Sequence, residues 1–308
     1  MSTPFVQIHL ALEHQGTRLP PHALFAIRQL FPAAFRRTTG CLSKDGSCSG
    51  SPDCPCRMIF DQNLTPDPSA LRRYQKPPLP FAFRIPILPG KSVKGTSVEL
   101  SLVIAGEAIS HLDLFLDAVR NLIGSSERMG LWHAARIEAA SEDGSLILIP
   151  SEGGGREFAN LPLLTFDDFF SRSCGACSSV TIDFLTPLRL LHKGVPLRDI
   201  AFSAVAGALF RRISSLAYYY GGEELPHDFK WLAARSREIA CSSSGLNWVN
   251  HGGSLQGIEG SVTFCGELTE FIPFLALGSR LNIGKGAAYG LGSYSFSGID
   301  SGMFAAGW

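Results

Sequence analysis

The sequence lacks a long apolar segment and a charged N-terminal leader. It contains no run of about 18 or more uninterrupted apolar residues, which a membrane-spanning helix would need. Residues 1–13 alternate between apolar and polar types, without the charged and then apolar pattern of a signal peptide. These absences predict a soluble, cytoplasmic protein with no membrane partner.

The chain also lacks net charge, because 27 Lys and Arg residues balance 27 Asp and Glu residues. This argues against a uniformly basic nucleic-acid-binding protein. The charges are unevenly distributed, however, since residues 1–94 contain 12 Lys and Arg against 5 Asp and Glu, a net charge of +7. Twenty of the 27 cationic residues are Arg, whose planar guanidinium suits bidentate contact with phosphate. A phosphate-binding first third and an Arg-rich solvated surface are both consistent with this distribution.

The length of 308 residues exceeds one average domain and suits two domains of roughly 150 residues each. Apolar residues make up 45% of the chain, an ordinary globular composition that excludes disorder of the whole chain. The eight cysteines would be mainly reduced in a cytoplasmic protein, so clustered cysteines are considered as metal ligands before disulfides.

Residues 1–150 have the pattern of one domain that opens with a strand and a helix. Its expected elements are strands at 5–12 and 98–104, helices from Pro20 and at 112–123, and a hairpin at 136–149. The stretch at 36–95 is rich in Cys, Pro and Arg and has little periodicity. It predicts an irregular insertion within the first domain.

A linker is predicted at residues 151–178, and a second domain at 179–308. The expected elements of the second domain are strands at 180–191, 260–268 and 288–296, and helices at 197–220, 227–241 and 269–276. Both halves therefore have a β-α-β-β-α-β-like order. This predicts an α+β fold of two tandem ferredoxin-like domains.

A glycine-rich run extends from Gly278 to Gly292, with five glycines in 15 residues and Lys285 between two of them. Glycine permits positive φ and close approach of the backbone to a ligand, so successive N–H groups can face phosphate oxygens. The spacing is neither that of a Walker A loop nor that of a dinucleotide-binding loop. A phosphate-contacting loop and a structural glycine turn remain the two alternatives.

The order of residue types in this run also resembles that of a known protein family. Residues 283–294, Ile-Gly-Lys-Gly-Ala-Ala-Tyr-Gly-Leu-Gly-Ser-Tyr, resemble the C-terminal signature of the CRISPR-associated RAMP endoribonucleases of family six. Blocks at 79–86, 183–189, 209–216 and 246–248 are similar to further blocks of that family. The resemblance implies two RAMP domains that bind CRISPR repeat RNA, such as a hairpin, and cut pre-crRNA into mature crRNA. It also implies other CRISPR effector subunits as partners.

Metal-independent RNA cleavage needs a base for the 2′-OH proton, an acid for the leaving 5′-oxygen, and cations for the charge on phosphorus oxygens. The product is a 2′,3′-cyclic phosphate, and catalysis needs no cofactor. The resemblance implies a histidine near the first helix, and His22 is therefore our first candidate. A histidine at a helix start is also a common surface residue.

Four other residues are candidates for catalysis. His9 shares a strand face with Gln7, although a hydrogen-bonded sheet histidine is an equal alternative. His133, beside Trp132, is the third histidine considered. Arg36 and Arg37 follow the first helix and would clamp the scissile phosphate, or else form a solvated helix end.

The expected RNA contacts lie in the second domain. Arg211 and Arg212 are consecutive helix residues that point about 100° apart, so only one of them is expected to face RNA or the linker. The tyrosines at 218–220 either stack on bases or pack against the fold. The predicted RNA-binding set is Gly284, Lys285, Gly286, Gly290, Gly292, Arg280, Arg211 and Arg212.

Four cysteines, Cys41, Cys48, Cys54 and Cys56, are candidate ligands of a structural zinc ion. Their spacing is less regular than two Cys-x-x-Cys pairs. The pair of Cys174 and Cys177 supports neither a redox nor a metal site. Two functions compete with an endoribonuclease: a non-catalytic RAMP subunit that holds crRNA in an effector complex, and a zinc-stabilised module unrelated to RNA.

Overall fold

The computed structural model describes residues 2–16, 19–41, 54–68, 70, 74–89, 94–126, 128–149, 161–172 and 175–298. The chain divides into two compact units. The N-terminal unit is Pro4–Leu164, and the C-terminal unit is Thr165–Trp308 together with Met1–Thr3. None of the helices in the described ranges has the length and apolar character needed to cross a bilayer.

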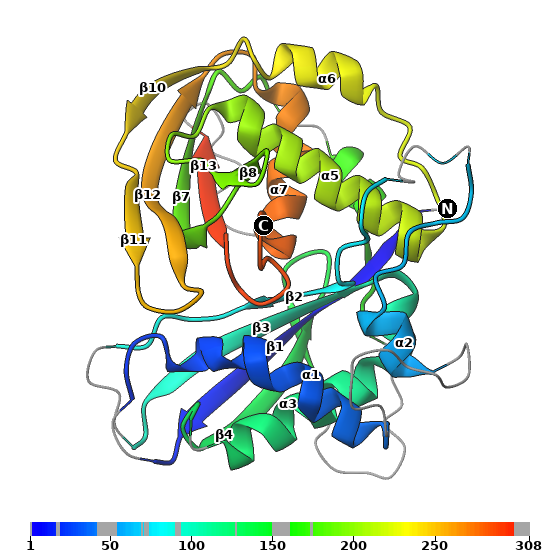
Figure 1. The fold of residues 1–308 in the computed structure, drawn as a ribbon, viewed down its shortest axis with the longest axis vertical. Helices are drawn as coiled ribbons and strands as arrows, with labels where there is room; N and C mark the ends of the chain where they lie inside the picture. The colour runs from blue at the N-terminus through cyan, green and yellow to red at the C-terminus, as the bar shows by residue number, and fades with distance from the viewer. Residues whose placement is uncertain are drawn as a thin grey trace. The chain divides into compact units, whose positions relative to one another are not determined.

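The N-terminal unit is built on an antiparallel sheet with the strand order β2-β3-β1-β4-β5, and β6 also pairs with β1 (Figure 1). Its elements are β1 (Pro4–His14), η1 (Ala23–Ala26), α1 (Ile27–Thr38), α2 (Pro55–Phe60), β2 (Phe81–Arg84), β3 (Ser97–Ala105), η2 (Gly106–His111), α3 (Leu112–Ser125), β4 (Trp132–Ala140), β5 (Leu146–Leu148) and β6 (Leu164–Thr165). The order of β1 to β4, with α1 and α3 as crossovers, is ferredoxin-like.

The core of this unit lies between one face of the sheet and helices α1 and α3. Ile8, Leu10 and Leu12 of β1 are fully buried, as the alternation of a half-buried strand requires. An aromatic cluster fills the space between the helices and the strands, with ring centroids 5.1–6.4 Å apart among Phe31, Phe35, Phe60, Phe81, Phe83 and Phe115. The ring of Phe60 brings α2 into this cluster.

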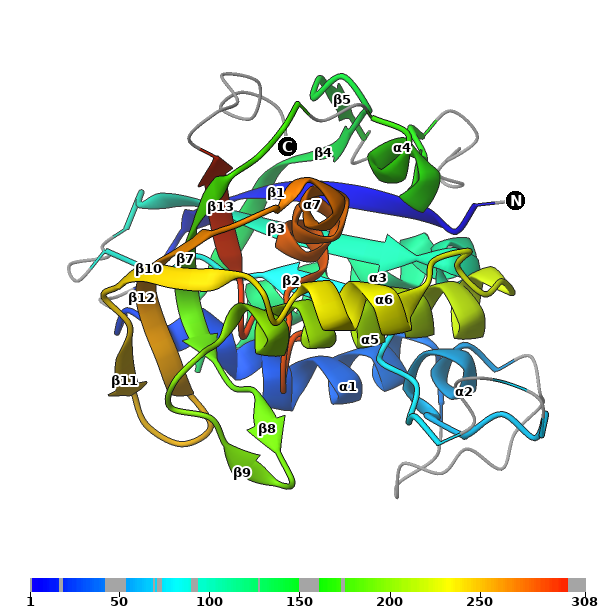
Figure 2. The same ribbon diagram turned by 90° about the horizontal axis from the view of Figure 1, so that it is seen from above.

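The C-terminal unit repeats the same topology with the order β10-β12-β7-β13, and β11 also pairs with β12 (Figure 2). Its elements are α4 (Phe166–Phe170), β7 (Ser179–Leu188), β8 (Leu191–His192), β9 (Val195–Pro196), α5 (Phe202–Gly221), α6 (Phe229–Arg235), β10 (Ala240–Ser244), β11 (Asn247–Asn250), β12 (Gln256–Cys265), η3 (Thr269–Phe271), α7 (Ile272–Leu281) and β13 (Tyr294–Gly298). The predicted α+β fold of tandem ferredoxin-like domains is confirmed.

Several predicted elements differ from those in the structure. The helix expected at 227–241 ends at Arg235, and β10 begins at Ala240. All five residues of β10 are exposed, so this edge strand lacks the apolar alternation by which strands are found in a sequence. The last strand begins at Tyr294 instead of residue 288, because the glycine-rich run continues to that point. The stretch at 36–95 is only partly irregular, since it contains α2 and β2.

Candidate functional site

The glycine-rich run folds into a compact loop that joins α7 to β13. Gly284, Gly286, Gly290 and Gly292 all have positive φ, between 64° and 90°. A Cβ atom on Gly292 would lie 2.0 Å from the carbonyl oxygen of Ile283, and one on Gly284 would lie 2.8 Å from that of Arg189. Both the backbone conformation and the lack of space therefore require glycine at these positions.

Most N–H groups of the loop are used inside the protein. Lys285 donates to Arg189 O (2.9 Å), and Gly292 donates to Pro187 O (3.2 Å). Further internal donors are Ile283, Ala287, Tyr289, Gly290 and Leu291. The N–H groups of Gly284 and Gly286 donate to no other described residue, and these glycines flank the exposed Lys285 at the tip. This narrows the predicted anion-contacting part to residues 284–286.

Side-chain hydrogen bonds, from Thr186 of β7 and from residues in and next to the loop, hold the loop in place. The Thr186 hydroxyl donates to Gly290 O (2.7 Å) and accepts from Ser293 N–H (2.9 Å). The Asn282 amide donates to Ala287 O (2.9 Å), and the Tyr294 hydroxyl donates to Leu275 O (2.6 Å). None of these residues was predicted as part of the site, although Thr186 lies in the family-like block at 183–189. They make the loop rigid before any ligand binds.

The three arginines predicted to contact RNA have different surroundings. Arg212 points to the end of α7, where its Nε–H donates to Leu281 O (2.8 Å) and its charge complements the helix dipole. Desolvation by burial lowers the pKa of Arg212 to about 10. Arg211 is exposed, and Arg280 is half-buried in the last turn of α7. Of the consecutive pair, Arg212 has a structural contact and Arg211 faces solvent.

The tyrosines at 218–220 lie in the last two turns of α5. Tyr220 is buried and packs within the C-terminal unit, and burial raises its pKa. Tyr218 and Tyr219 are half-buried, with ring centroids 5.1 Å apart in an edge-on arrangement. Of the two roles considered for these tyrosines, Tyr220 therefore has the one of packing against the fold.

His9 lies in a network of polar side chains on the sheet face opposite α1 and α3. Its Nδ1 atom is 2.7 Å from Glu99 Oε1 and 3.3 Å from Ser101 Oγ, and its Nε2 atom is 2.8 Å from the Gln7 side-chain nitrogen. Since an amide nitrogen can only donate, Nε2 accepts, and Nδ1 carries the proton that Glu99 accepts. In this tautomer the lone pair of Nε2 accepts the Gln7 amide hydrogen, and Nε2 can act as a base only where another donor replaces that amide.

His22, Arg36 and Arg37 lie at opposite ends of one helical segment. His22 precedes η1, half-buried, with its ring centroid 6.0 Å from that of Phe25. Arg36 and Arg37 lie in the last turn of α1, and the Arg36 guanidinium carbon is 5.7 Å from the centroid of Phe60. Helical rise separates His22 from Arg36 by roughly 20 Å. One scissile phosphate therefore cannot contact both residues.

His133, the third histidine considered, is exposed on β4 opposite Glu13 of β1. Its side chain points outward in the pleat and belongs to none of the hydrogen-bonded networks described above.

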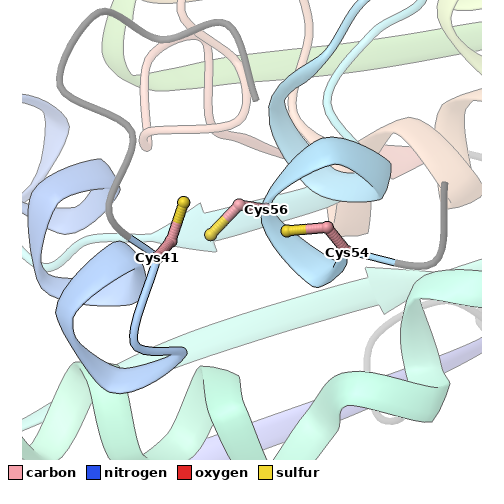
Figure 3. Close-up of side chains that lie close together, drawn as sticks. All are labelled: Cys41, Cys54 and Cys56. Carbon is pink, nitrogen blue, oxygen red and sulfur yellow. The ribbon is translucent and has the colours of Figure 1, made fainter. Parts of the chain in front are cut away.

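Three of the four predicted cysteine ligands come together (Figure 3). The sulfur atoms of Cys41, Cys54 and Cys56 all lie within 4.8 Å of one another, and none of the three is in a disulfide with a described cysteine. Desolvation by burial raises the pKa of the Cys56 thiol to about 12, while Thr39 at 3.0 Å opposes the rise. Cys48 lies outside the described residues, as does Cys174; Cys177 is buried in the C-terminal unit.

Comparison with protein families matches both units. Residues 3–157 match the family model AF_1859_N, which is described as an N-terminal domain. Residues 182–294, which include the glycine-rich loop, match the family model CRISPR-associated endoribonuclease Cas6. The chain carries a Cas6 family domain in its C-terminal unit. It is accordingly an endoribonuclease of CRISPR RNA processing, and the RAMP resemblance drawn from the glycine signature is confirmed.

Solved Cas6 structures have the same fold. Cas6 (TTHB231) from Thermus thermophilus, in a product complex, is 19% identical with a TM-score of 0.56, over 96% of this chain and 100% of that chain. Cas6 (TTHA0078), in a substrate mimic complex, is 14% identical with a TM-score of 0.55, over 96% and 99%. A partial Cas6-RT-Cas1–Cas2 complex is 13% identical with a TM-score of 0.61, over 99% of this chain and 47% of that chain. No curated protein matches the chain.

One pocket of the C-terminal unit was not predicted from the sequence. It has a volume of about 390 Å³ and is lined by Phe170, Arg172, Pro226, His227, Asp228, Trp231, Leu232, Thr269, Glu270, Pro273 and Phe274. The rings of Phe170 and Phe274 lie 4.5 and 5.2 Å from that of His227. Desolvation lowers the pKa of His227, and the charge of Asp167 opposes this. These residues form no motif, because segments around 170, 230 and 270 contribute them.

Proposed function

We propose that the chain cleaves CRISPR repeat RNA, in the form of a hairpin, without a metal ion at the cleaved phosphate. The 2′-oxygen attacks the adjacent phosphorus, a new O2′–P bond forms, and the P–O5′ bond breaks. A base takes the 2′-OH proton, and an acid protonates the leaving 5′-oxygen. The products are a 2′,3′-cyclic phosphate and a 5′-hydroxyl end, and the mature crRNA is one of them.

The hydrogen-bonded pair of His9 and Glu99 is the observation that supports this mechanism. A base held in one tautomer by a carboxylate is the arrangement that activates hydroxyl nucleophiles in enzymes. With Nδ1–H donated to Glu99, Nε2 of His9 is free to take the proton once the 2′-OH replaces the Gln7 amide. Glu99 then stabilises the imidazolium that forms. Among the catalytic candidates, we therefore place His9 before His22, Arg36 and Arg37.

The tip of the glycine-rich loop is the proposed phosphate contact. Two N–H groups, of Gly284 and Gly286, and the ammonium group of Lys285 together provide the donors that anion-binding loops use. Gly290, Gly292 and Arg212 support the loop from within and do not touch the ligand. Arg211 and Arg280 are proposed to contact the RNA backbone further from the tip. The solved Cas6 relatives are described in complexes with product and with a substrate mimic, which supports a bound substrate of this kind.

The test is a cleavage assay with the cognate repeat RNA in the presence of a chelator, with single-turnover rates for H9A, E99Q and H22A. H133A is the matched control, because His133 is an exposed histidine of the same unit. Loss of a general base slows cleavage by roughly 100- to 10,000-fold, so H9A should lose at least 100-fold while H133A stays within about threefold. E99Q should fall between them, because it leaves the imidazole in place without its charged partner.

Two outcomes would contradict the proposal. If H9A cleaves at the wild-type rate and H22A does not, the base is His22 and the His9 network is structural. If the wild-type protein binds the repeat tightly but never cuts it, the chain holds crRNA without processing it. A 2′,3′-cyclic phosphate on the product, detected by mass spectrometry, separates 2′-OH attack from hydrolysis by water.

A further inference from the structure

The cysteine cluster is not used by the proposed cleavage mechanism. Cys41 lies just beyond the end of α1, after Thr39 and Gly40 with φ of 66°, and its N–H donates to Arg36 O (2.9 Å). Cys54 precedes α2, and Cys56 is the second residue of that helix. The three sulfur atoms point toward one another from these two elements (Figure 3).

We propose that Cys41, Cys54 and Cys56 bind one zinc ion that fixes α2 against the end of α1. Zinc binds thiolate sulfur at about 2.3 Å in tetrahedral geometry, which places neighbouring sulfur atoms roughly 3.8 Å apart. The observed sulfur atoms are within 4.8 Å of one another, so a shift of about 1 Å brings them into place. Side-chain rotation alone supplies such a shift. Cys48 is the fourth ligand that the sequence predicts, and the proposal does not require it.

The chemistry of the surroundings favours a soft divalent ion. Three thiolates select zinc over calcium and magnesium, which prefer oxygen ligands. The Thr39 hydroxyl donates to Arg36 O (3.0 Å) and lies 3.0 Å from Cys56 Sγ, so its hydrogen would turn from Arg36 O to the sulfur in order to donate to a metal-bound thiolate. Such partners of the ligands orient them and are a regular part of metal sites.

The packing around the cluster indicates what the metal does. Helix α2 has only six residues, too few to be stable by helix propensity alone. Phe60 anchors its end among Phe31, Phe35 and Phe81, with ring centroids 5.5–6.4 Å away. A zinc ion at its beginning provides the second attachment. Because Arg36 packs on Phe60, the same ion restrains the position of Arg36.

The experiment measures metal content and thermal stability of the full-length protein, purified without chelator and with reductant. We expect about one zinc per chain, which falls well below half in C41S and C56S. C241S is the matched control, because Cys241 is an exposed thiol outside the cluster, and its zinc content should equal the wild-type value. Zinc at one hundred times its Kd should raise Tm by roughly 5–10 °C over the apo protein.

A spectroscopic measurement on the wild-type protein guards against variants that fail to fold. Cobalt added to apo protein should give thiolate-to-cobalt charge-transfer absorption and strong tetrahedral visible bands, and one equivalent of zinc should abolish them. A wild-type protein that takes up neither ion, or in which two of the three cysteines form a disulfide, would overturn the proposal. These readouts need no RNA, so they remain valid even if the cleavage mechanism proves wrong.

Discussion

Replacing Gly292 by alanine tests whether the loop depends on the absence of a side chain. Gly222, which follows α5, is the matched control, because both glycines lie in the C-terminal unit with φ near +64° and +71°. A Cβ on Gly222 would meet nothing within 4 Å, whereas one on Gly292 would lie 2.0 Å from Ile283 O. The two substitutions therefore share the conformational cost and differ in the steric one.

The expected magnitudes follow from these two terms. Alanine in the left-handed region costs about 1–2 kcal/mol, and the reduced entropy of the unfolded chain returns about 0.4–1 kcal/mol. G222A should therefore lower the free energy of unfolding by roughly 1 kcal/mol. G292A adds the displacement of a backbone carbonyl, an overpacking term of about 1–3 kcal/mol. It also disturbs the hydrogen bond from Ile283 N–H to Gly292 O, of about 1 kcal/mol. We expect a total of roughly 3–5 kcal/mol.

Urea unfolding followed by tryptophan fluorescence measures the free energy of unfolding of both variants. In thermal unfolding, the Tm values of the two variants should differ by roughly 5–10 °C. Equal destabilisation of G292A and G222A, within about 0.5 kcal/mol, would refute the steric reasoning. It would mean that the loop adapts to a side chain, and the rigid presentation of its tip would then be incorrect.

Further predictions concern charged side chains of the same unit. R212M should lower the free energy of unfolding by roughly 1.5–3 kcal/mol, because Leu281 O loses a charged donor. R211M should stay within about 0.5 kcal/mol of the wild-type value. Urea unfolding of both variants checks this difference. K285A should weaken RNA binding and reduce the slope of log K against log salt by about 0.7–0.9, unlike K230A on the exposed face of α6. The lowered pKa of His227 means that the unfolded state binds its proton more readily, so stability is full above the unfolded pKa and declines as pH falls below it. Between pH 7.5 and pH 5, the Tm of the H227F variant should therefore fall less than the Tm of the wild-type protein.

Elements with strong apolar periodicity could be predicted from the sequence. Helix α3 was expected at 112–123, and its residues Phe115, Leu116 and Val119 are fully buried. Strand β10 could not be predicted, because its five exposed residues carry no burial signal and only pairing with β12 makes them a strand. The local pattern of apolar residues indicates which residues are buried, whereas an exposed edge strand is recognised only by its pairing with the neighbouring strand.

The candidate site, too, could be predicted from the sequence only in part. Glycine spacing predicted a loop with special backbone angles, but not that Arg189 and Pro187, about 100 residues earlier, would take up its N–H groups. Proximity to the first helix favoured His22, whereas the partner that orients His9 is Glu99, 90 residues away. The 100° angle between helix neighbours predicted that Arg211 and Arg212 would differ. Only the position of the α7 terminus decides which one is structural.

In each unit the first strand of the ferredoxin-like order pairs with the fourth, β1 with β4 and β7 with β13. Ile8 near the start of β1 pairs with Ala139 near the end of β4, and Val180 of β7 pairs with Gly298 of β13. Paired residues of antiparallel strands have Cα atoms about 4.5–5.5 Å apart, so the beginning of the first strand and the end of the fourth strand lie side by side in each unit. A short peptide could therefore join the end of the fourth strand to the beginning of the first strand in such a unit. Circular permutation and insertion into another protein should leave the sheet of such a unit intact.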